Sequence, residues 1–108
     1  METVEFDLVV TGGLTWARIA VLGELDLSTA DELREALDQE MRNGRSVILD
    51  LSQVAFVDST GLTVILRTMQ AAQEGRWNFG VAAELSPAAL RTIRVAGVLP
   101  LLPLVEES

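Results

Sequence analysis

The sequence predicts a single α/β domain, a mixed, largely parallel sheet of 4–5 strands flanked by three main helices. Short apolar, β-prone runs alternate with longer segments whose apolar residues recur every three or four positions. Glycine or proline stands at most boundaries between these segments. The connections are short, and strand-helix-strand units with short connections place their strands parallel in one sheet.

The first two segments favour a β-hairpin. Residues 4–10 are apolar and β-prone, and residues 16–22 have the same character. Gly12 and Gly13 lie between them and are typical of a turn. We therefore expect two adjacent antiparallel strands, the second of which is interrupted at Gly23.

The first helix is predicted to begin at Ser28. Its hydroxyl can cap the helix, and Asp31 follows three positions later in a variant of the capping box. Gly44 is placed to end the helix. Apolar residues at helical spacing define the face expected to point inward: Ala30, Leu33, Ala36, Leu37 and Met41.

A buried strand and the second helix come next. Residues 46–51 contain a consecutive Val-Ile-Leu run, which is typical of a parallel strand covered on both faces. A short link over residues 52–57 leads to the turn Asp58-Ser59-Thr60-Gly61, where the second helix is expected to begin, with Gly75 as its end. Its predicted inward side chains are Leu62, Ile65, Leu66, Met69 and Ala72.

The last part of the chain repeats the strand-helix order. Residues 78–83 favour a strand, and Ser86 followed by Pro87 provides a cap and a proline at the first helical position. Gly97 should end this third helix. Residues 101–105 can form one more short strand, which two nearby prolines confine to a sheet edge or a tail.

Length and composition indicate one domain. The chain has 108 residues, 49% of them hydrophobic, which is enough for one core. We assign residues 1–108 to a single domain, with a core at about 4–99 and a short edge strand or tail at 100–108. No long apolar run is present and the first residues are acidic, so we expect a cytoplasmic protein without a membrane partner.

Composition excludes several kinds of chemistry. The chain has no cysteine and no histidine, which removes disulfides, thiolate metal sites and imidazole catalysis. Phosphate-binding loops and the usual nucleophile motif are also absent. We expect no catalytic residue, no metal and no cofactor, and therefore no enzyme. A net charge of -8 opposes direct contact with nucleic acid.

Two acidic turns are the candidate functional site. In open α/β sheets, sites gather at the carboxyl ends of strands, where we expect the turns Gly23-Glu24-Leu25-Asp26 and Asp58-Ser59-Thr60-Gly61. A serine such as Ser59 ordinarily caps a helix, and Glu24 and Asp26 are ordinarily solvated turn residues. Three successive polar side chains followed by glycine nevertheless exceed what one cap requires.

Ser59 is suited to carry a phosphate. A phosphoryl group adds about -1.5 to -2 charges, and the positive end of a helix dipole tolerates them at a helix start. A partner docked on this turn would have to oppose a dianion beside Asp58 and Asp26. Like-charge opposition can cost several kcal/mol, and about 1.4 kcal/mol changes affinity tenfold. The sequence therefore indicates a binding surface with a removable charge.

Together these segments resemble the STAS domain, which sulphate transporters and anti-sigma factor antagonists share, and in particular the stand-alone bacterial antagonists. The resemblance covers about residues 4–99 and predicts a single STAS-like domain. The segments that carry it are, in chain order, Gly23-Glu24-Leu25-Asp26, Val47-Ile48-Leu49-Asp50-Leu51-Ser52, Phe56-Val57, Asp58-Ser59-Thr60-Gly61-Leu62, Leu85-Ser86-Pro87 and Val95-Ala96-Gly97.

The resemblance implies a partner-switching cycle. The dephosphorylated protein binds an anti-sigma factor, typically a serine kinase with a histidine-kinase-like ATPase fold, and so frees a sigma factor. The kinase phosphorylates the serine after the motif's aspartate, here Ser59, with Thr60 as the less favoured site, and a serine phosphatase restores the protein. The predicted partner-binding residues are Glu24, Asp26, Asp58, Ser59, Thr60, Gly61 and Leu62.

Two alternatives stay open. The same surface could serve an accessory STAS subunit of another assembly, such as a lipid-transport ATPase or a stress-sensing complex. A nucleotide-sensing domain is the other alternative, although the chain has no phosphate-cradling loop.

Overall fold

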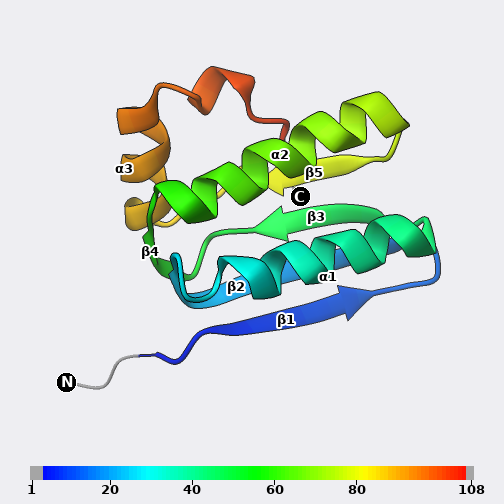
Figure 1. Ribbon diagram of the computed structural model, residues 1–108, viewed down its shortest axis with the longest axis horizontal. Coiled ribbons are helices and arrows are strands. Elements are labelled where there is room, and N and C mark those ends of the chain that lie inside the picture. The colour runs from blue at the N-terminus through cyan, green and yellow to red at the C-terminus, as the bar shows by residue number, and fades with distance from the viewer. Residues whose placement is uncertain (1–3, 107–108) are drawn as a thin grey trace.

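The computed structural model describes residues 4–106, and Figure 1 shows one α/β domain whose elements follow the predicted order apart from a short additional strand and a 3-10 helix. The first three and last two residues of the predicted domain lie outside the described residues. The elements are β1 (Asp7–Gly12), β2 (Trp16–Leu25), α1 (Ala30–Asn43), β3 (Ser46–Asp50), β4 (Val54–Val57), α2 (Ser59–Gly75), β5 (Phe79–Ala82), α3 (Pro87–Ala96), the 3-10 helix η1 (Leu99–Leu101) and β6 (Leu104–Val105).

The sheet is mixed and largely parallel, as predicted. Its strand order is β1-β2-β3-β5-β6, with β4 paired to β2 beside this path. The predicted hairpin is confirmed, because β1 and β2 are antiparallel, while the other pairings are parallel. The sheet has six strands rather than four to five. The additional strand is β4, whose four residues carry too short a pattern to be distinguished from a link.

The predicted interruption at Gly23 is wrong, since β2 continues to Leu25. The pairing register shifts between Gly23 and Glu24, and there β2 changes its partner from β3 to β4. Gly23 has φ 80°, and a Cβ at this position would lie 2.7 Å from the backbone nitrogen of Phe6. Glycine therefore permits an irregularity inside a continuous strand, which directs the end of β2 toward β4.

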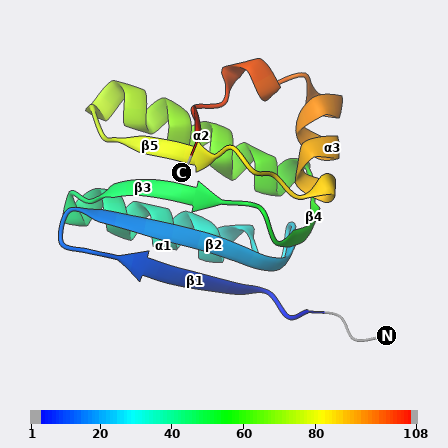
Figure 2. The ribbon, with the colours of Figure 1, turned by 180° about the vertical axis from the view of Figure 1, so that it is seen from behind.

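The helices α1 and α2 lie side by side on one face of the sheet and run in the same direction (Figure 1). The third helix packs at the end of the sheet, where Thr92 Oγ1 donates a hydrogen bond of 2.7 Å to the carbonyl of Val57 on β4. In Figure 2 no helix of the described chain covers the opposite face of β1, β2 and β3.

The expectation that the central strand is covered on both faces is therefore wrong. In β3, Val47 and Leu49 are buried beneath the helices, whereas Ile48 points to the other face and is half-buried. A consecutive apolar run does not show whether helices cover one face of a strand or both, because the same residues are compatible with either arrangement.

Most predicted inward faces are confirmed. In α1 the buried side chains include Ala30, Leu33 and Leu37, while Met41 is half-buried. The core of the domain joins these helix residues to apolar side chains of the sheet. Its largest fully buried members are Ile19, Leu25, Leu33, Leu37, Leu49, Leu51, Ile65, Ile93, Val21, Val47, Val54 and Val81.

One predicted helix end requires correction. Ser28 does not cap α1, because its hydroxyl donates a hydrogen bond of 2.7 Å to Asp26 Oδ1, and the helix begins at Ala30. The predicted end of α2 at Gly75 is confirmed, because Gly75 is the last residue of the helix and Arg76 follows in the left-handed conformation with φ 56°. The other predicted ends are confirmed, namely those at Gly44, Ser86 and Gly97.

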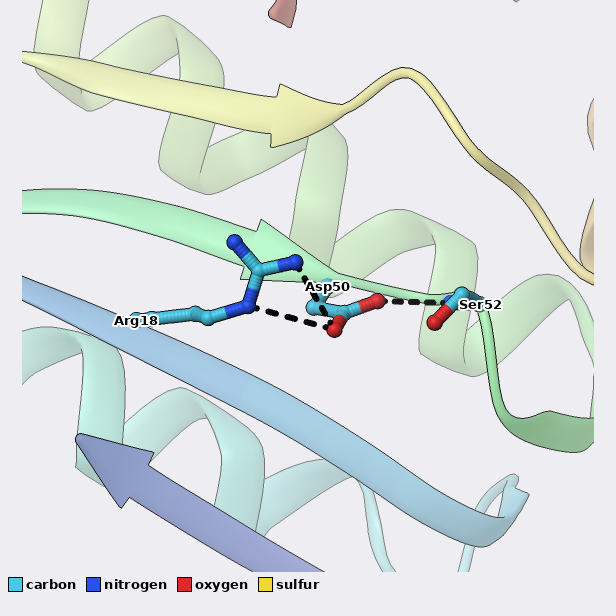
Figure 3. A network of polar contacts seen from close by, with 3 residues as sticks. All are labelled: Arg18, Asp50 and Ser52. Carbon is cyan, nitrogen blue, oxygen red and sulfur yellow. Dashed lines mark hydrogen bonds and ion pairs between the residues drawn. The ribbon is translucent and has the colours of Figure 1, made fainter. Parts of the chain in front are cut away.

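An ion pair links neighbouring strands on the open face of the sheet. Figure 3 shows Asp50 on β3 between Arg18 on β2 and Ser52. Asp50 Oδ2 accepts hydrogen bonds from Arg18 Nη2 at 3.0 Å and from Arg18 Nε at 3.3 Å, and its Oδ1 accepts one from the Ser52 N–H at 2.8 Å. Burial alone would raise the pKa of Asp50, but the hydrogen bonds from Ser52 and Arg18 outweigh it and hold the pKa below its ordinary value.

Asp50→Asn is expected to lower the free energy of unfolding at pH 7 by about 1–3 kcal/mol, the usual size for charged hydrogen bonds. Because the folded-state pKa is depressed, this stabilisation is present above the unfolded-state pKa of about 3.9 and is lost as pH falls through the folded-state pKa. Urea unfolding of both proteins should show their difference shrinking below about pH 4. A difference that stays constant under acid conditions would contradict the prediction.

Candidate functional site

The Asp58-Ser59-Thr60-Gly61 turn starts α2, and Asp58 rather than Ser59 caps the helix. Asp58 Oδ1 accepts a hydrogen bond of 2.9 Å from the Gly61 N–H. Ser59 is the first residue of α2 and is exposed. Its hydroxyl makes no hydrogen bond with any residue of the described range 4–106. Asp58 therefore has the capping role that a serine at this position ordinarily takes, and the Ser59 hydroxyl faces solvent.

The turn after β2 presents the carboxylate of Asp26. Asp26 Oδ1 accepts hydrogen bonds from the Ser28 hydroxyl at 2.7 Å and from the Ser28 N–H at 2.9 Å. The hydroxyl bond is the main reason that the pKa of Asp26 lies below its ordinary value, against the opposing effect of desolvation. Thr29 Oγ1 donates to the Glu24 carbonyl at 2.8 Å and accepts from the Asp26 N–H at 3.0 Å. The turn is thus ordered and negatively charged at neutral pH.

The pairing of β2 with β4 brings the two turns together. Leu25 pairs with Val57, and the Asp58 N–H donates a hydrogen bond of 3.1 Å to the Leu25 carbonyl. Asp26 and Asp58 consequently line one shallow hollow at the carboxyl end of the sheet. Ser59 and Thr60 do not line this hollow and instead line a separate groove between α1 and α2.

Not all predicted site residues share this hollow. Glu24 is exposed and lines a separate hollow with Asp26, beside residues 4–6. Gly61 and Leu62 are buried, and a Cβ on Gly61 would lie 2.6 Å from Leu25 Cγ. In the free chain these two residues position the turn from beneath, whereas the carboxylates and Ser59 form its surface.

Two apolar side chains of the hollow were missed from the sequence. Leu27 is 78% exposed and Phe56 is 44% exposed, and both line the hollow with Asp26 and Asp58. The available signal was a large apolar residue directly after one acidic turn and another two positions before Asp58. Exposed apolar groups rimmed by charge are typical of a protein-binding surface.

The described residues show neither a metal-binding cluster nor a membrane-spanning helix. Within residues 4–106 there is no group of three or more acidic, histidine or cysteine side chains arranged to hold a metal ion. The helices of this range are also too short or too polar to cross a bilayer.

The fold and the serine-bearing turn define a class of protein. A family model described as "Mlab, STAS domain" matches residues 9–103, and the chain belongs to the STAS domain family. This confirms the resemblance that the segments from Gly23 to Gly97 carry.

Curated relatives are named as regulatory proteins. The chain is 32% identical to the "Anti-sigma-B factor antagonist" of Listeria monocytogenes over 81 residues, 74% of this chain and 70% of the relative. It is 27% identical to the "Anti-sigma F factor antagonist" of Paenibacillus polymyxa over 90 residues, 82% of this chain and 76% of the relative.

Solved structures show the same fold. An anti-sigma factor antagonist from Mycobacterium paratuberculosis matches with a TM-score of 0.79 and 29% identity, covering 93% of this chain and 85% of its own. The antagonist SpoIIAA in its unphosphorylated form matches with a TM-score of 0.74 and 19% identity, covering 96% and 89%. The α/β fold with three helices on a mixed sheet is therefore that of the family.

Proposed function

We propose that this protein is an anti-sigma factor antagonist whose docking surface is the hollow around Asp26, Leu27, Phe56 and Asp58, with Ser59 as its switch. The dephosphorylated protein binds an anti-sigma factor serine kinase in the cytoplasm, and a sigma factor is released. Phosphorylation of Ser59 ends the complex, and a serine phosphatase reverses it. One observation carries the proposal: Ser59 directly follows Asp58, which lines this surface, and its exposed hydroxyl makes no hydrogen bond within the described residues because Asp58 caps the helix.

The surface matches a partner with both basic and apolar groups. Asp26 and Asp58 supply negative charge, and Leu27 and Phe56 supply apolar area within the same hollow. Complementary charge guides encounter and orientation, while buried apolar side chains contribute most of the affinity. The names of the curated relatives support an anti-sigma factor as this partner.

The position of Ser59 supports its proposed role as acceptor of a phosphoryl group. In the reaction, Ser59 Oγ attacks the γ-phosphorus of ATP, the bond from that phosphorus to the bridging oxygen breaks, and ADP leaves. The hydroxyl proton passes to a base of the kinase. Because Asp58 already caps α2, the modification does not remove a cap, and the N-terminal end of the helix dipole favours the added negative charge.

The phosphate should dissociate the complex through charge and bulk. A kinase docked over Ser59 holds its own nucleotide phosphates opposite this residue. A phosphoserine carries a charge of about -1.5 to -2, which the nucleotide phosphates of the kinase repel. It also occupies space that the unmodified serine leaves free. Attraction between basic partner groups and Asp26 or Asp58 continues at the rim, where charges contribute little because solvent screens them.

Ser59→Asp is expected to weaken binding to a cognate anti-sigma factor kinase at least tenfold, whereas Ser59→Ala should bind but accept no phosphate at this site. Isothermal titration with the purified kinase measures affinity, and mass spectrometry after incubation with ATP locates the phosphate. Thr60→Ala is the control, because its neighbouring hydroxyl is removed and phosphorylation at Ser59 should persist. Equal affinity of Ser59→Asp and wild type would show that this turn is not the switch.

A second function is an accessory STAS subunit of another assembly. The matching family model is described as "Mlab, STAS domain" and not by sigma-factor regulation. Such a subunit would use the same hollow as a permanent contact. Parallel titrations against an ATPase-fold kinase and against a transport ATPase from the same genome discriminate the two functions. Titration with ATP and GTP tests the nucleotide-sensing alternative.

A further inference from the structure

A groove between α1 and α2 begins at Ser59, on the other side of the turn from the docking hollow. It encloses about 480 Å³, and Figure 1 shows its two walls as parallel helices that start at the same end of the domain. Its floor includes the small or apolar residues Ala30, Met41 and Ala71. The charged residues that line it are Asp31, Arg34, Asp38 and Arg67, and its hydroxyl-bearing residues include Ser59 and Thr63.

Arg34 is the cation on the α1 wall. It lies one helical turn after Ala30, about 6 Å along the axis, and Ala30 and Ser59 line the same groove at the start of their helices. Side chains on a helix lean toward its N-terminus. The Arg34 guanidinium lies between Asp31, in the first turn of α1, and Asp38, one turn after Arg34, and its Nε is on the side of Asp31 and the helix start.

Weak ion pairs hold Arg34 in place. Arg34 Nε lies 3.4 Å from Asp31 Oδ1, and Arg34 Nη1 lies 3.6 Å from Asp38 Oδ2. The side chains of Arg34 and Asp31 are 51% and 85% exposed, respectively. Exposed pairs of this kind contribute little, since solvent screens them. A nearby dianion can consequently replace a single carboxylate as the partner of Arg34.

We propose that Arg34 binds the phosphate of phosphorylated Ser59, moving from Asp31 to the phosphate and so linking α1 to the start of α2. This inference rests on the proposed phosphorylation of Ser59. The planar guanidinium donates two parallel hydrogen bonds to phosphate oxygens, a geometry that lysine cannot reproduce. The phosphate then has a fixed position on the groove side of the turn, and its charge is partly balanced within the protein.

Arg67 provides a matched comparison on the opposite wall. It lines the same groove, but lies eight residues after Ser59, about 12 Å along the axis of α2. The other charged groups around the phosphate are Asp31 and Asp38 on the groove side, and Asp26 and Asp58 on the hollow side. All four carboxylates raise the second pKa of the phosphate, and a bound arginine lowers it.

The test places phosphoserine at position 59 during translation, so that no kinase is required. The second pKa of the phosphoserine, near 6 for a free group, is measured by ³¹P NMR titration in the full chain. Arg34→Gln is expected to raise this pKa by about half a unit, Arg34→Lys by less, and Arg67→Gln by about 0.1 unit or less. The Arg34 Nε–H resonance should also shift on phosphorylation in the wild-type protein.

Two outcomes would overturn the inference: an unchanged pKa in Arg34→Gln, or equal changes in Arg34→Gln and Arg67→Gln. Thermal unfolding of the unphosphorylated variants verifies that each is folded, as expected for exposed positions. The result is separable from that of the proposed function. If no kinase modifies Ser59, the proposed cycle fails while this measurement stands, and an unchanged pKa leaves the cycle intact.

Discussion

Gly61→Ala is expected to lower the free energy of unfolding by about 1–3 kcal/mol, the usual cost of overpacking a filled core. An added Cβ would lie 2.6 Å from Leu25 Cγ and 2.9 Å from the Leu25 carbonyl oxygen. Leu25 is fully buried, so neither atom can move away freely. The higher helix propensity of alanine, worth about 1 kcal/mol, offsets only part of this cost. Urea unfolding at neutral pH measures the change.

Gly75→Ala is the matched control on the same helix. A Cβ at Gly75 meets nothing within 4 Å, so this variant is expected to be as stable as the wild type or more stable by up to about 1 kcal/mol. The two substitutions add the same methyl group and should change stability in opposite directions. Equal free energies of unfolding for Gly61→Ala and Gly75→Ala would contradict the close packing of Gly61 in α2 against Leu25 in β2.

Leu27→Ala and Phe56→Ala are each expected to weaken binding of the anti-sigma factor kinase about tenfold or more. Both side chains are exposed in the docking hollow, and an apolar anchor at the centre of an interface typically contributes 1.4 kcal/mol or more, about a tenfold change. Because they are exposed in the free protein, their truncation should change its stability little. Isothermal titration with the kinase measures the affinity of each variant.

Leu14→Ala is the control for these variants. Leu14 is 97% exposed in the connection between β1 and β2, at the opposite end of β2 from Leu27. Its truncation removes the same apolar group as Leu27→Ala but lies outside the hollow, so affinity should be unchanged. Equal affinities of Leu14→Ala and Leu27→Ala would place the docking surface elsewhere on the molecule.

Residues close together in the chain determine much of the fold and of the candidate site. The hairpin, the three helices, the Ser86 cap with Pro87 after it, and the glycine ends at Gly44 and Gly97 all follow from patterns a few residues long. The same patterns place the two acidic turns at one edge of the sheet. Their order and spacing also identify the family, which the matching family model confirms.

Hydrogen bonds between residues only two or three positions apart decided the two helix caps that these patterns left open. The turn before α2 has three successive polar side chains, of which Asp58 caps the helix, and this leaves the Ser59 hydroxyl exposed. The prediction that Ser28 caps α1 is wrong for a related reason, because the Ser28 hydroxyl donates its hydrogen bond to Asp26. Each turn carries more than one side chain able to cap a helix, and propensity alone cannot rank such alternatives.

Ser59 was identifiable from the sequence as a candidate because a polar turn at a helix start has a local signature. The surface around it was not identifiable, since that surface exists only where β2 pairs with β4 and Asp58 N–H bonds to Leu25. This pairing joins residues about 30 positions apart, and it leaves Leu27 and Phe56 exposed beside two carboxylates. Local sequence determines which groups a turn carries, whereas long-range packing determines which of them remain free to bind.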